Sequence, residues 1–412
     1  MITYEEALSL ILSHSLPVGI EECALADLLG RVLAAPVEAT SDMPLFDNSA
    51  VDGFGVLTGD VAQASSESPV ELELRGTIQA GDESRWQCGP GSAIKILTGA
   101  TVPASVQAVV MREFCQEHNG IVVIRQSARA GENIRRRGEE FKAGEQILPA
   151  GIRITPPVLG LLAGLGHASF PVYHKPSVAV ISTGDELISP GQSLQPGQIF
   201  DANSFALKSA VNALKIDRCA RLHTPDDRES TKEVLMAAFE SADIVISAGG
   251  VSVGDFDFVK DVSEQIGIET IFWRIALKPG KPVYFGRLPA TAGRAQKLIF
   301  GLPGNPVSAL VTFHQLVKPA LLKIMGLPNH EPLSLCARLT RTIRKKAGRM
   351  EFVRGILRTD SGQLQVEPTT GQESHMMGGL APANCLIIFP LDDTILPEGQ
   401  AVIVELLSWS DM

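Results

Sequence analysis

Apolar strands that run directly into glycine-rich loops dominate the middle of the chain. The apolar run 243–247 is followed by Ala-Gly-Gly-Val-Ser-Val-Gly-Asp, and the run 298–301 is followed by Leu-Pro-Gly-Asn-Pro-Val-Ser-Ala. Because glycine has no Cβ and adopts positive φ without strain, backbone N–H groups in such loops can approach an anion closely. A chain with this pattern is expected to form an α/β sheet whose strand ends bind phosphate or another oxyanion.

Two lysines lie between these loops, in the run Leu-Lys-Pro-Gly-Lys-Pro. Lys278 and Lys281 are three residues apart on a chain stiffened by two prolines, so both ammonium groups could converge on one anion. After the last loop, Asn305 suits the N-cap and Pro306 the first turn of an apolar helix, whose N-terminus would carry about half a positive charge. Ordinary turn chemistry explains any one of these loops, whereas three of them in one α/β unit favour anion binding.

Strand and helix patterns alternate from residue 175 onwards. Apolar runs at 178–181 and 219–222 indicate strands, and amphipathic periods at 204–214 and 228–241 indicate helices. Such alternation predicts a mainly parallel sheet with helices on both faces, in which ligands bind beyond the carboxyl ends of the strands. The glycine loops all follow strands, so the pattern places them at that edge.

Different patterns flank this segment and predict a multidomain α/β protein. Helical periods at 4–14, 25–33 and 155–165 predict a helical linker domain in two pieces. Short apolar runs separated by turns, at 70–74, 93–97, 108–111 and 121–124, predict a β-rich domain inserted between the pieces. Alternating runs after residue 327 predict a small C-terminal β-barrel domain. The predicted domains are 1–41 with 145–174, 42–144, 175–327 and 328–412.

Composition excludes several classes of protein. The 412 residues carry 36 Lys and Arg against 46 Asp and Glu, and the net charge of −10 disfavours nucleic acid as a partner. The six cysteines are scattered without a Cys-x-x-Cys pair, which argues against a zinc site or a disulfide framework. No apolar run reaches the roughly 18 residues of a membrane span, and the N-terminus lacks a basic start. We therefore expect a cytoplasmic protein without a membrane segment.

Five motifs make the chain resemble the molybdopterin molybdenumtransferase family, which includes bacterial MoeA and the corresponding domain of gephyrin. They are FDNSAVDGF from Phe46, STGDEL from Ser182, SAGGVSVGDFD from Ser247, KPGKP from Lys278 and GLPGNPVSA from Gly301. Their order follows the family over essentially the whole chain. The resemblance implies an α/β sandwich of the molybdopterin-binding type. It also implies insertion of molybdate into adenylylated molybdopterin, with release of AMP and with Mg²⁺ as the divalent metal.

The resemblance further implies catalytic and metal-binding residues. The catalytic residues carried over are Asp52, Thr98, Glu186, Asp257, Lys278 and Lys281. The metal ligands carried over are Asp52, Glu140, Glu186 and Asp257. Asp52 could either hold Mg²⁺ or orient an attacking group, and an Asx turn explains the same motif without chemistry. Glu140 stands where the family carries Asp, and Arg274 stands where relatives often carry Lys.

Substrate-binding residues are expected on the loops that follow the strands of the α/β domain. They are Ser182, Gly184, Asp185, Asp201, Asn203, Asp226, Gly249, Gly250, Ser252, Gly254, Pro282, Pro303, Gly304, Asn305, Pro306 and Ser308. By resemblance, the C-terminal domain adds Arg349 or Arg354, and Ser374, next to the oxyanion. Eight Lys and Arg between residues 338 and 358 agree with an anion site, although a solvated sheet face would carry the same charges.

The resemblance implies a homodimer whose active sites are shared between protomers. Molybdopterin adenylyltransferase and cofactor-receiving enzymes are candidate partners. Two alternatives stay open. A molybdopterin adenylyltransferase has a similar α/β domain, but it would need neither the inserted β-rich domain nor the C-terminal one. A non-catalytic scaffold that binds a partner peptide would not need the clustered acids and lysines.

Overall fold

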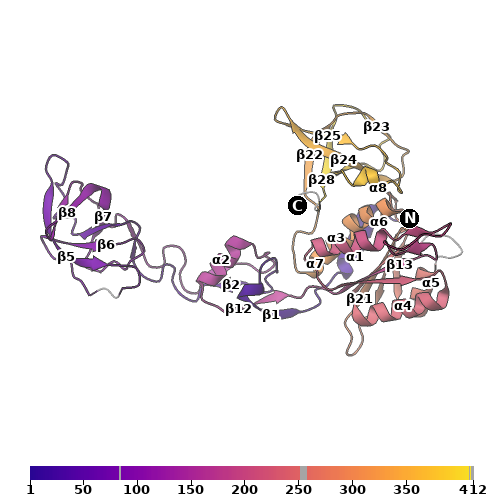
Figure 1. The fold of residues 1–412 in the computed structure, drawn as a ribbon, viewed down its shortest axis with the longest axis horizontal. Coiled ribbons are helices and arrows are strands. Elements are labelled where there is room, and N and C mark those ends of the chain that lie inside the picture. Colours follow the sequence, from indigo (N-terminus) through magenta and orange to yellow (C-terminus); the bar gives the residue numbers. More distant parts are fainter. Residues whose placement is uncertain (83–84, 251–257, 408, 410–412) are drawn as a thin grey trace. The chain divides into compact units, whose positions relative to one another are not determined.

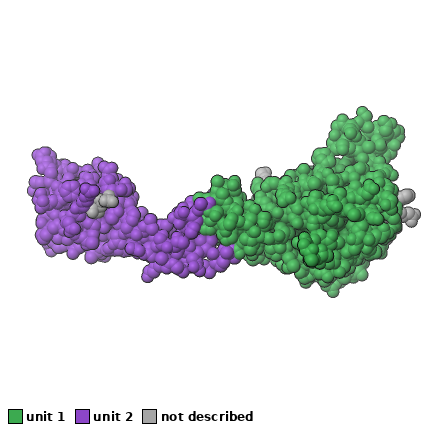
Figure 2. Space-filling model, turned by 90° about the horizontal axis from the view of Figure 1, so that it is seen from below, with its two compact units in different colours: residues 1–34, 151–156, 169–412 green, residues 35–150, 157–168 purple. Residues whose placement is uncertain are grey.

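The computed structural model describes residues 1–82, 85–250, 258–407 and 409 of the chain. It divides into two compact units, which are coloured separately in Figure 2. Unit 1 contains residues 1–34, 151–156 and 169–412, and unit 2 contains residues 35–150 and 157–168. The four predicted domains are a finer division, and their boundaries stay a prediction.

A six-stranded sheet forms the centre of the α/β region of unit 1 (Figure 1), with the strand order β16-β13-β17-β21-β20-β18. The parallel strands are β13 (Val178–Thr183), β16 (Cys219–Thr224), β17 (Ile244–Ala248) and β21 (Lys297–Leu302). The antiparallel strands at one edge are β20 (Tyr284–Leu288) and β18 (Glu269–Trp273). The mainly parallel sheet is confirmed, and the antiparallel edge is an addition that the sequence patterns did not reveal.

Helices cover both faces of this sheet (Figure 1). One face carries α3 (Asn203–Ala213) and α6 (Pro306–Thr312), and the other carries α4 (Arg228–Ser241) and α5 (Val259–Gln265). Successive side chains of a strand point to opposite faces. Ile244 and Ile246 of β17 therefore lie in the core shared with α3, whereas Val245 lies in the core shared with α4. Strands that are apolar on both faces are typical of a parallel sheet between two helical layers.

The helix predicted after Asn305 is confirmed, but it contains a wider turn. α6 continues through a π-helical turn at Phe313–Val317 into α7 (Lys318–Ile324). All residues of the π-helical turn are buried. This continuous buried segment anchors the glycine loop that precedes α6 to the core of unit 1.

The C-terminal part of unit 1 is a closed barrel, as predicted. Its strands are β22 (Ser334–Leu339), β24 (Met350–Asp360), β25 (Gln363–Pro368), β26 (Cys385–Phe389) and β28 (Ala401–Leu406). They pair in the circular order β24-β25-β22-β28-β26, and β26 pairs back to β24. The short strand β19 (Leu277–Lys278) pairs in parallel with β24, so the lysine-bearing segment of the α/β region is attached to the barrel.

The N-terminal helix forms as predicted, but it packs in a different place. α1 (Tyr4–His14) begins with a capping box between Thr3 and Glu6. Ala7 and Ile11 lie in the core that α3, α6 and the sheet share. The helix therefore packs with the α/β region rather than with the predicted helical linker.

The predicted helix at 25–33 is wrong. Only a 3₁₀ turn forms there, at Leu25–Asp27, and it follows β1 (Ile20–Ala24), which pairs with β12 (Ser169–Tyr173). Leu28 and Val32 have the four-residue spacing of a helix face and are buried, but they lie in a non-helical segment. These residues are buried by contacts with distant segments, and their spacing in the sequence happens to match that of a helix. Periodicity alone cannot distinguish the two cases.

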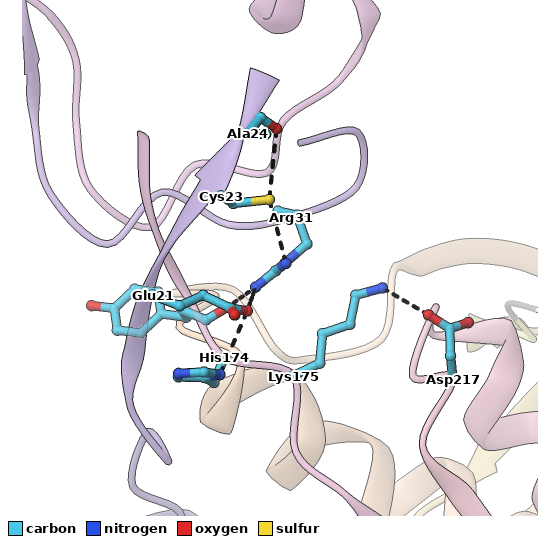
Figure 3. A network of polar contacts seen from close by, with 8 residues as sticks. Glu21, Cys23, Ala24, Arg31, His174, Lys175 and Asp217 are labelled. Carbon is cyan, nitrogen blue, oxygen red and sulfur yellow. Dashed lines mark hydrogen bonds and ion pairs between the residues drawn. The ribbon is translucent and has the colours of Figure 1, made fainter. Parts of the chain in front are cut away.

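A polar network fastens the β1–β12 ribbon (Figure 3). The Arg31 guanidinium donates to the Glu21 carboxylate, and His174 Nδ1 lies 3.5 Å from the same carboxylate. The hydrogen bond from Arg31 holds the pKa of the Glu21 carboxyl below its usual range. Lys175 Nζ reaches Asp217 at 3.2 Å. These contacts fix the path of the chain as it enters the α/β region.

Unit 2 contains a six-stranded sheet of its own, in the order β7-β4-β6-β5-β9-β8. Its strands are β4 (Gly53–Val56), β5 (Val70–Ile78), β6 (Ser92–Ile96), β7 (Ala108–Met111), β8 (Cys115–His118) and β9 (Ile121–Ile124). The four strands predicted from apolar runs are confirmed, as is the helix at 155–165, which forms as α2 (Pro156–Gly164). In the described part of the chain, no helix is both long and apolar enough to cross a membrane.

Candidate functional site

A cavity of about 690 Å³ lies at the carboxyl edge of the α/β sheet. The ends of β13, β16, β17 and β21 with the loops that follow them, and the start of α3, form much of its wall. The lining residues from these segments include Thr183, Glu186, Asp201, Asn203, Asp226, Gly249, Gly250, Pro303, Gly304, Asn305 and Pro306. All of these except Thr183 were predicted as site residues. The cavity therefore forms where the glycine loops predicted a binding edge.

Two glycines near this wall adopt backbone conformations that other residues rarely reach. Gly249 has a φ of +103°, and a Cβ there would lie 2.6 Å from Thr183 Oγ1. Gly184 has a φ of +142°, and a Cβ there would lie 2.5 Å from Glu186 Oε2. The Gly249 N–H donates to the Leu302 carbonyl at 3.0 Å, which ties the loop after β17 to the end of β21. Substitution of either glycine would displace a side chain that lines the cavity.

Asp201 supports the cavity wall from the inside. Its buried carboxylate accepts hydrogen bonds from Ser182 Oγ at 2.9 Å, from the Ser204 N–H at 3.0 Å and from the Ser204 hydroxyl. These bonds fix the first turn of α3 against the end of β13. Ser182 and Asp201 were both predicted to bind the substrate, but they bond to each other, and Ser182 does not line the larger cavity.

Asn203 carries an amide that is satisfied on one side only. Its Nδ2 donates to the Gly304 carbonyl at 2.6 Å. Its Oδ1 is buried and has no hydrogen-bond partner among the residues that the structure describes. Buried acceptors are usually paired, so this oxygen could accept a hydrogen bond from a ligand in the cavity. Nearby, Asp185 accepts from the Asp226 N–H at 3.2 Å, which orients the Asp226 loop.

A smaller cavity of about 240 Å³ adjoins the first one and shares Pro282, Pro303 and Asn305 with it. Besides these three, five further predicted site residues from different parts of the chain line it, namely Lys278, Lys281, Ser308, Arg349 and Ser374. Three of them are cationic and two carry hydroxyl groups. The structure therefore gathers the donors that an oxyanion needs around one small space.

Two hydrogen bonds attach the barrel loop that carries Ser374 to the start of α6. Asn305 Nδ2 donates to Ser374 Oγ at 3.0 Å, and the Val307 N–H donates to the Ser374 carbonyl at 3.1 Å.

Lys278 Nζ lies 2.8 Å from Glu351 Oε1. Sequence reasoning missed Glu351, because only the pairing of β19 with β24 brings it opposite Lys278.

Arg354 does not take the place that was considered for it beside the oxyanion. Its side chain is buried, and Nη2 donates to the carbonyls of Gly371 at 2.6 Å and Glu373 at 3.3 Å. Burial lowers the pKa of its guanidinium. Arg354 therefore supports the loop that carries Ser374, while Arg349 is the arginine that lines the smaller cavity.

A separate pair of predicted site residues meets in unit 2. The Asp52 carboxylate accepts hydrogen bonds from the Thr98 N–H and from Thr98 Oγ1, both at 2.7 Å. These two bonds hold the pKa of the Asp52 carboxyl below its usual range. Both residues are exposed. The structure thus presents Asp52 as an ionised carboxylate in a fixed orientation on the surface of unit 2.

The charged turn of unit 2 is largely neutralised by its own acids. Arg136 reaches Asp47 and Arg137 reaches Asp42, each at 2.6 Å. Glu140 is exposed, and its carboxylate has neither an ion pair nor a hydrogen bond to any residue described. Two of the three arginines of the turn 135–137 are therefore paired with aspartates, while the Glu140 carboxylate is unpaired among the described residues.

Other predicted residues have different outcomes. Asp257, Ser252 and Gly254 lie outside the described residues. Arg274 packs over the ring of Trp273, with its guanidinium 3.9 Å from the ring centroid, and it lines neither cavity. Thr183 and His375 line the larger cavity but were not predicted, since a lone hydroxyl or imidazole carries no pattern in the sequence.

The described residues do not form a metal site made by protein ligands alone. No group of three or more His, Cys, Asp or Glu side chains gathers among them in a way that could hold an ion. Glu186 and Asp226 do line the larger cavity. Mg²⁺ usually binds through one or two carboxylates together with water and substrate phosphates. These two oxygen donors fit an ion bound jointly with a phosphate-containing ligand.

Family profiles match the chain in three successive parts. The MoeA N-terminal region (domain I and II) matches residues 2–166, a probable molybdopterin binding domain matches residues 179–323, and the MoeA C-terminal region (domain IV) matches residues 336–407. The parts that flank the α/β region therefore also belong to the MoeA pattern.

Known relatives match over almost the whole chain. The molybdopterin molybdenumtransferase of Haemophilus influenzae is 36% identical over 409 residues and covers 98% of each chain. That of Bacillus subtilis is 35% identical and covers 94% of this chain and 90% of its own. The crystal structure of the molybdopterin biosynthesis moeA protein from Pyrococcus horikosii has a TM-score of 0.82 and 32% identity over 98% of this chain and 99% of that one. The chain belongs to the MoeA family of molybdopterin molybdenumtransferases, which are transferases of molybdenum cofactor biosynthesis.

Proposed function

We propose that the chain inserts molybdate into adenylylated molybdopterin and releases AMP and the molybdenum cofactor. The observation that carries the proposal is the smaller cavity, in which Lys278, Lys281 and Arg349 line a space of about 240 Å³. Molybdate is a compact dianion, and charge-assisted hydrogen bonds from lysine and arginine bind such anions strongly. Ser308 and Ser374 would add neutral donors to its remaining oxygens.

The larger cavity would hold the adenylylated pterin. Its volume of about 690 Å³ is typical of a small-molecule site. Gly249 and Gly250 would let the backbone approach the pyrophosphate, and Asn203 Oδ1 would accept a hydrogen bond from the ligand. Because the two cavities share Pro282, Pro303 and Asn305, a substrate in one would lie next to an oxyanion in the other.

We further propose that Mg²⁺ binds together with the pyrophosphate. Glu186 and Asp226 would hold it from the wall of the larger cavity, and the bound ion would neutralise charge on the bridging phosphates. Asp52, Glu140 and Asp257 stay proposed ligands by family resemblance. Lys278, Lys281 and Arg349 would meanwhile keep the oxyanion in place, which is a role that needs no proton transfer.

We also propose a homodimer with shared active sites. The proposed catalytic residues are divided, since Asp52 and Thr98 belong to unit 2 while Glu186 and the two lysines belong to unit 1. A two-fold symmetric dimer would let unit 2 of one protomer serve unit 1 of its partner, and the reverse.

AMP release from adenylylated molybdopterin tests this function. Release should require both molybdate and Mg²⁺. An equal rate after complete chelation of divalent metal would contradict the metal assignment, and a rate independent of molybdate would contradict the insertion step. An adenylyltransferase would instead form pyrophosphate from ATP and molybdopterin, and a scaffold would turn over neither substrate.

A further inference from the structure

Glu351 is an acidic residue on the wall of the cavity that Lys278, Lys281 and Arg349 make cationic. The parallel register of β19 and β24 places Glu351 opposite Lys278. Its Oε1 lies 2.8 Å from Lys278 Nζ. Because the backbone pairing of two strands sets this ion pair, Glu351 holds the Lys278 ammonium in a defined place.

The three cations of this cavity are not equivalent. Within the described ranges, neither Lys281 nor Arg349 forms an ion pair, whereas Lys278 does. An ammonium group has three N–H donors. With one of them directed to Glu351, two remain on Lys278 for a bound anion. Glu351 and the anion would therefore share the same ammonium.

The Glu351 carboxylate is less exposed to solvent than the other acid that lines the cavity, Glu373, so its charge is screened less. The Glu351 side chain is only 12% exposed, whereas Glu373 is exposed. Charges that are partly buried are screened less than charges in water. Glu351 should therefore repel an approaching oxyanion more strongly than Glu373 does, although both line the cavity.

We infer that Glu351 is a positioning residue with two opposing effects. Its hydrogen bond orients Lys278 towards the cavity, and its charge lowers the affinity of the cavity for oxyanions. The cavity therefore binds its anion more weakly than Lys278, Lys281 and Arg349 would without Glu351. Weaker binding favours transfer of the anion out of the cavity in the next step of the reaction. This inference rests on the proposed function of the cavity as a molybdate site.

Direct titration of the full-length protein with molybdate, measured by calorimetry, tests the inference. In Glu351→Gln the amide oxygen still accepts from Lys278 but the charge is gone, so the molybdate Kd should fall about threefold to tenfold. In Glu351→Ala the acceptor is lost as well, so the Kd should fall by a smaller factor. The matched control is Glu373→Gln, which removes the same charge from the same cavity and should change the Kd by less than about twofold.

Three outcomes would overturn the inference. They are a Kd for Glu351→Gln that is not below that of the wild type, equal decreases in Glu351→Gln and Glu373→Gln, and a lower Kd in Glu351→Ala than in Glu351→Gln. Lys281→Ala tests the underlying function separately. If it leaves the Kd unchanged, the cavity is not the molybdate site. If it weakens binding while Glu351→Gln behaves as the wild type, only the role of Glu351 is rejected.

Discussion

The proposed catalytic residues of the two units are arranged in opposite ways. In unit 1, side chains and backbone groups from several loops line two adjoining cavities. In unit 2, the Asp52 and Thr98 pair is exposed, and the neighbouring arginines Arg136 and Arg137 are neutralised by aspartates. Unit 1 thus has enclosed space for a ligand within itself. In unit 2 the structure shows an oriented carboxylate, Asp52, and we propose that it acts on a substrate held by another surface.

The largest effect is expected from an experiment that asks whether Asp52 acts on a substrate bound by a second copy of the chain. Asp52→Ala and Glu186→Ala should each abolish AMP release, because each removes a proposed catalytic carboxylate. Refolded together, the two variants should regain about a quarter of the wild-type activity, since random pairing makes half of the dimers mixed and each mixed dimer has one complete site. AMP release after refolding of differently tagged chains measures this recovery.

Each variant refolded alone provides the control, and isolation through both tags shows that mixed dimers have formed. Verified mixed dimers without activity would mean that Asp52 serves the site of its own chain. Unit 2 would then have to meet unit 1 within one protomer.

A smaller effect is expected from the cations of unit 1. Lys281→Ala should raise the half-saturating molybdate concentration about tenfold to 150-fold, because a charge-assisted hydrogen bond contributes roughly 1.5–3 kcal/mol. Lys278→Ala should have at least as large an effect, since it also leaves the Glu351 carboxylate without its counter-ion beside the bound anion. Initial rates of AMP release over a range of molybdate concentrations measure both.

Arg136→Ala is the matched control in unit 2, because Arg136 already pairs with Asp47. It should leave the half-saturating molybdate concentration unchanged. An equal increase in Arg136→Ala and Lys281→Ala would mean that both units bind the oxyanion, and the contrast between them would fail.

Sequence patterns could predict the part of the site that depends on local structure. The strand ends and the loops with Gly249 and Asn305 follow from hydrophobic periodicity, glycine and proline, which act over a few residues. Motif resemblance added Asp52 and Thr98 separately, and the structure joins them through two hydrogen bonds.

What could not be predicted depends on contacts between distant segments. Glu351 reaches Lys278 only through the pairing of β19 with β24, and Arg354 donates to carbonyl groups of the separate loop that carries Gly371 and Glu373. The wrongly predicted helix at 25–33 has the same origin, because Leu28 and Val32 are four residues apart and buried by other segments of the chain rather than by a helix of their own. Hydrophobic periodicity indicates that such residues are buried, but it does not indicate whether the segment that carries them is helical.

The smallest expected effect concerns the environment of Asp52 in unit 2. The Thr98 N–H and hydroxyl lower the pKa of the Asp52 carboxyl, so the carboxylate is favoured in the folded protein. This stabilisation is lost as the pH falls through the folded pKa.

Thr98→Val keeps the N–H and the side-chain shape but removes the hydroxyl. The Asp52 pKa should therefore rise part of the way to its usual value, and the acid limb of the AMP-release profile should move to higher pH. Asp52 stays ionised at pH 7, so a loss of activity at that pH would report a direct role of the Thr98 hydroxyl rather than its effect on the Asp52 charge. Thr98→Ser, which keeps a hydroxyl, should titrate as the wild type does. NMR titration of the Asp52 carboxyl carbon measures the shift, and identical titrations in Thr98→Val and the wild type would show that the backbone N–H alone sets its charge.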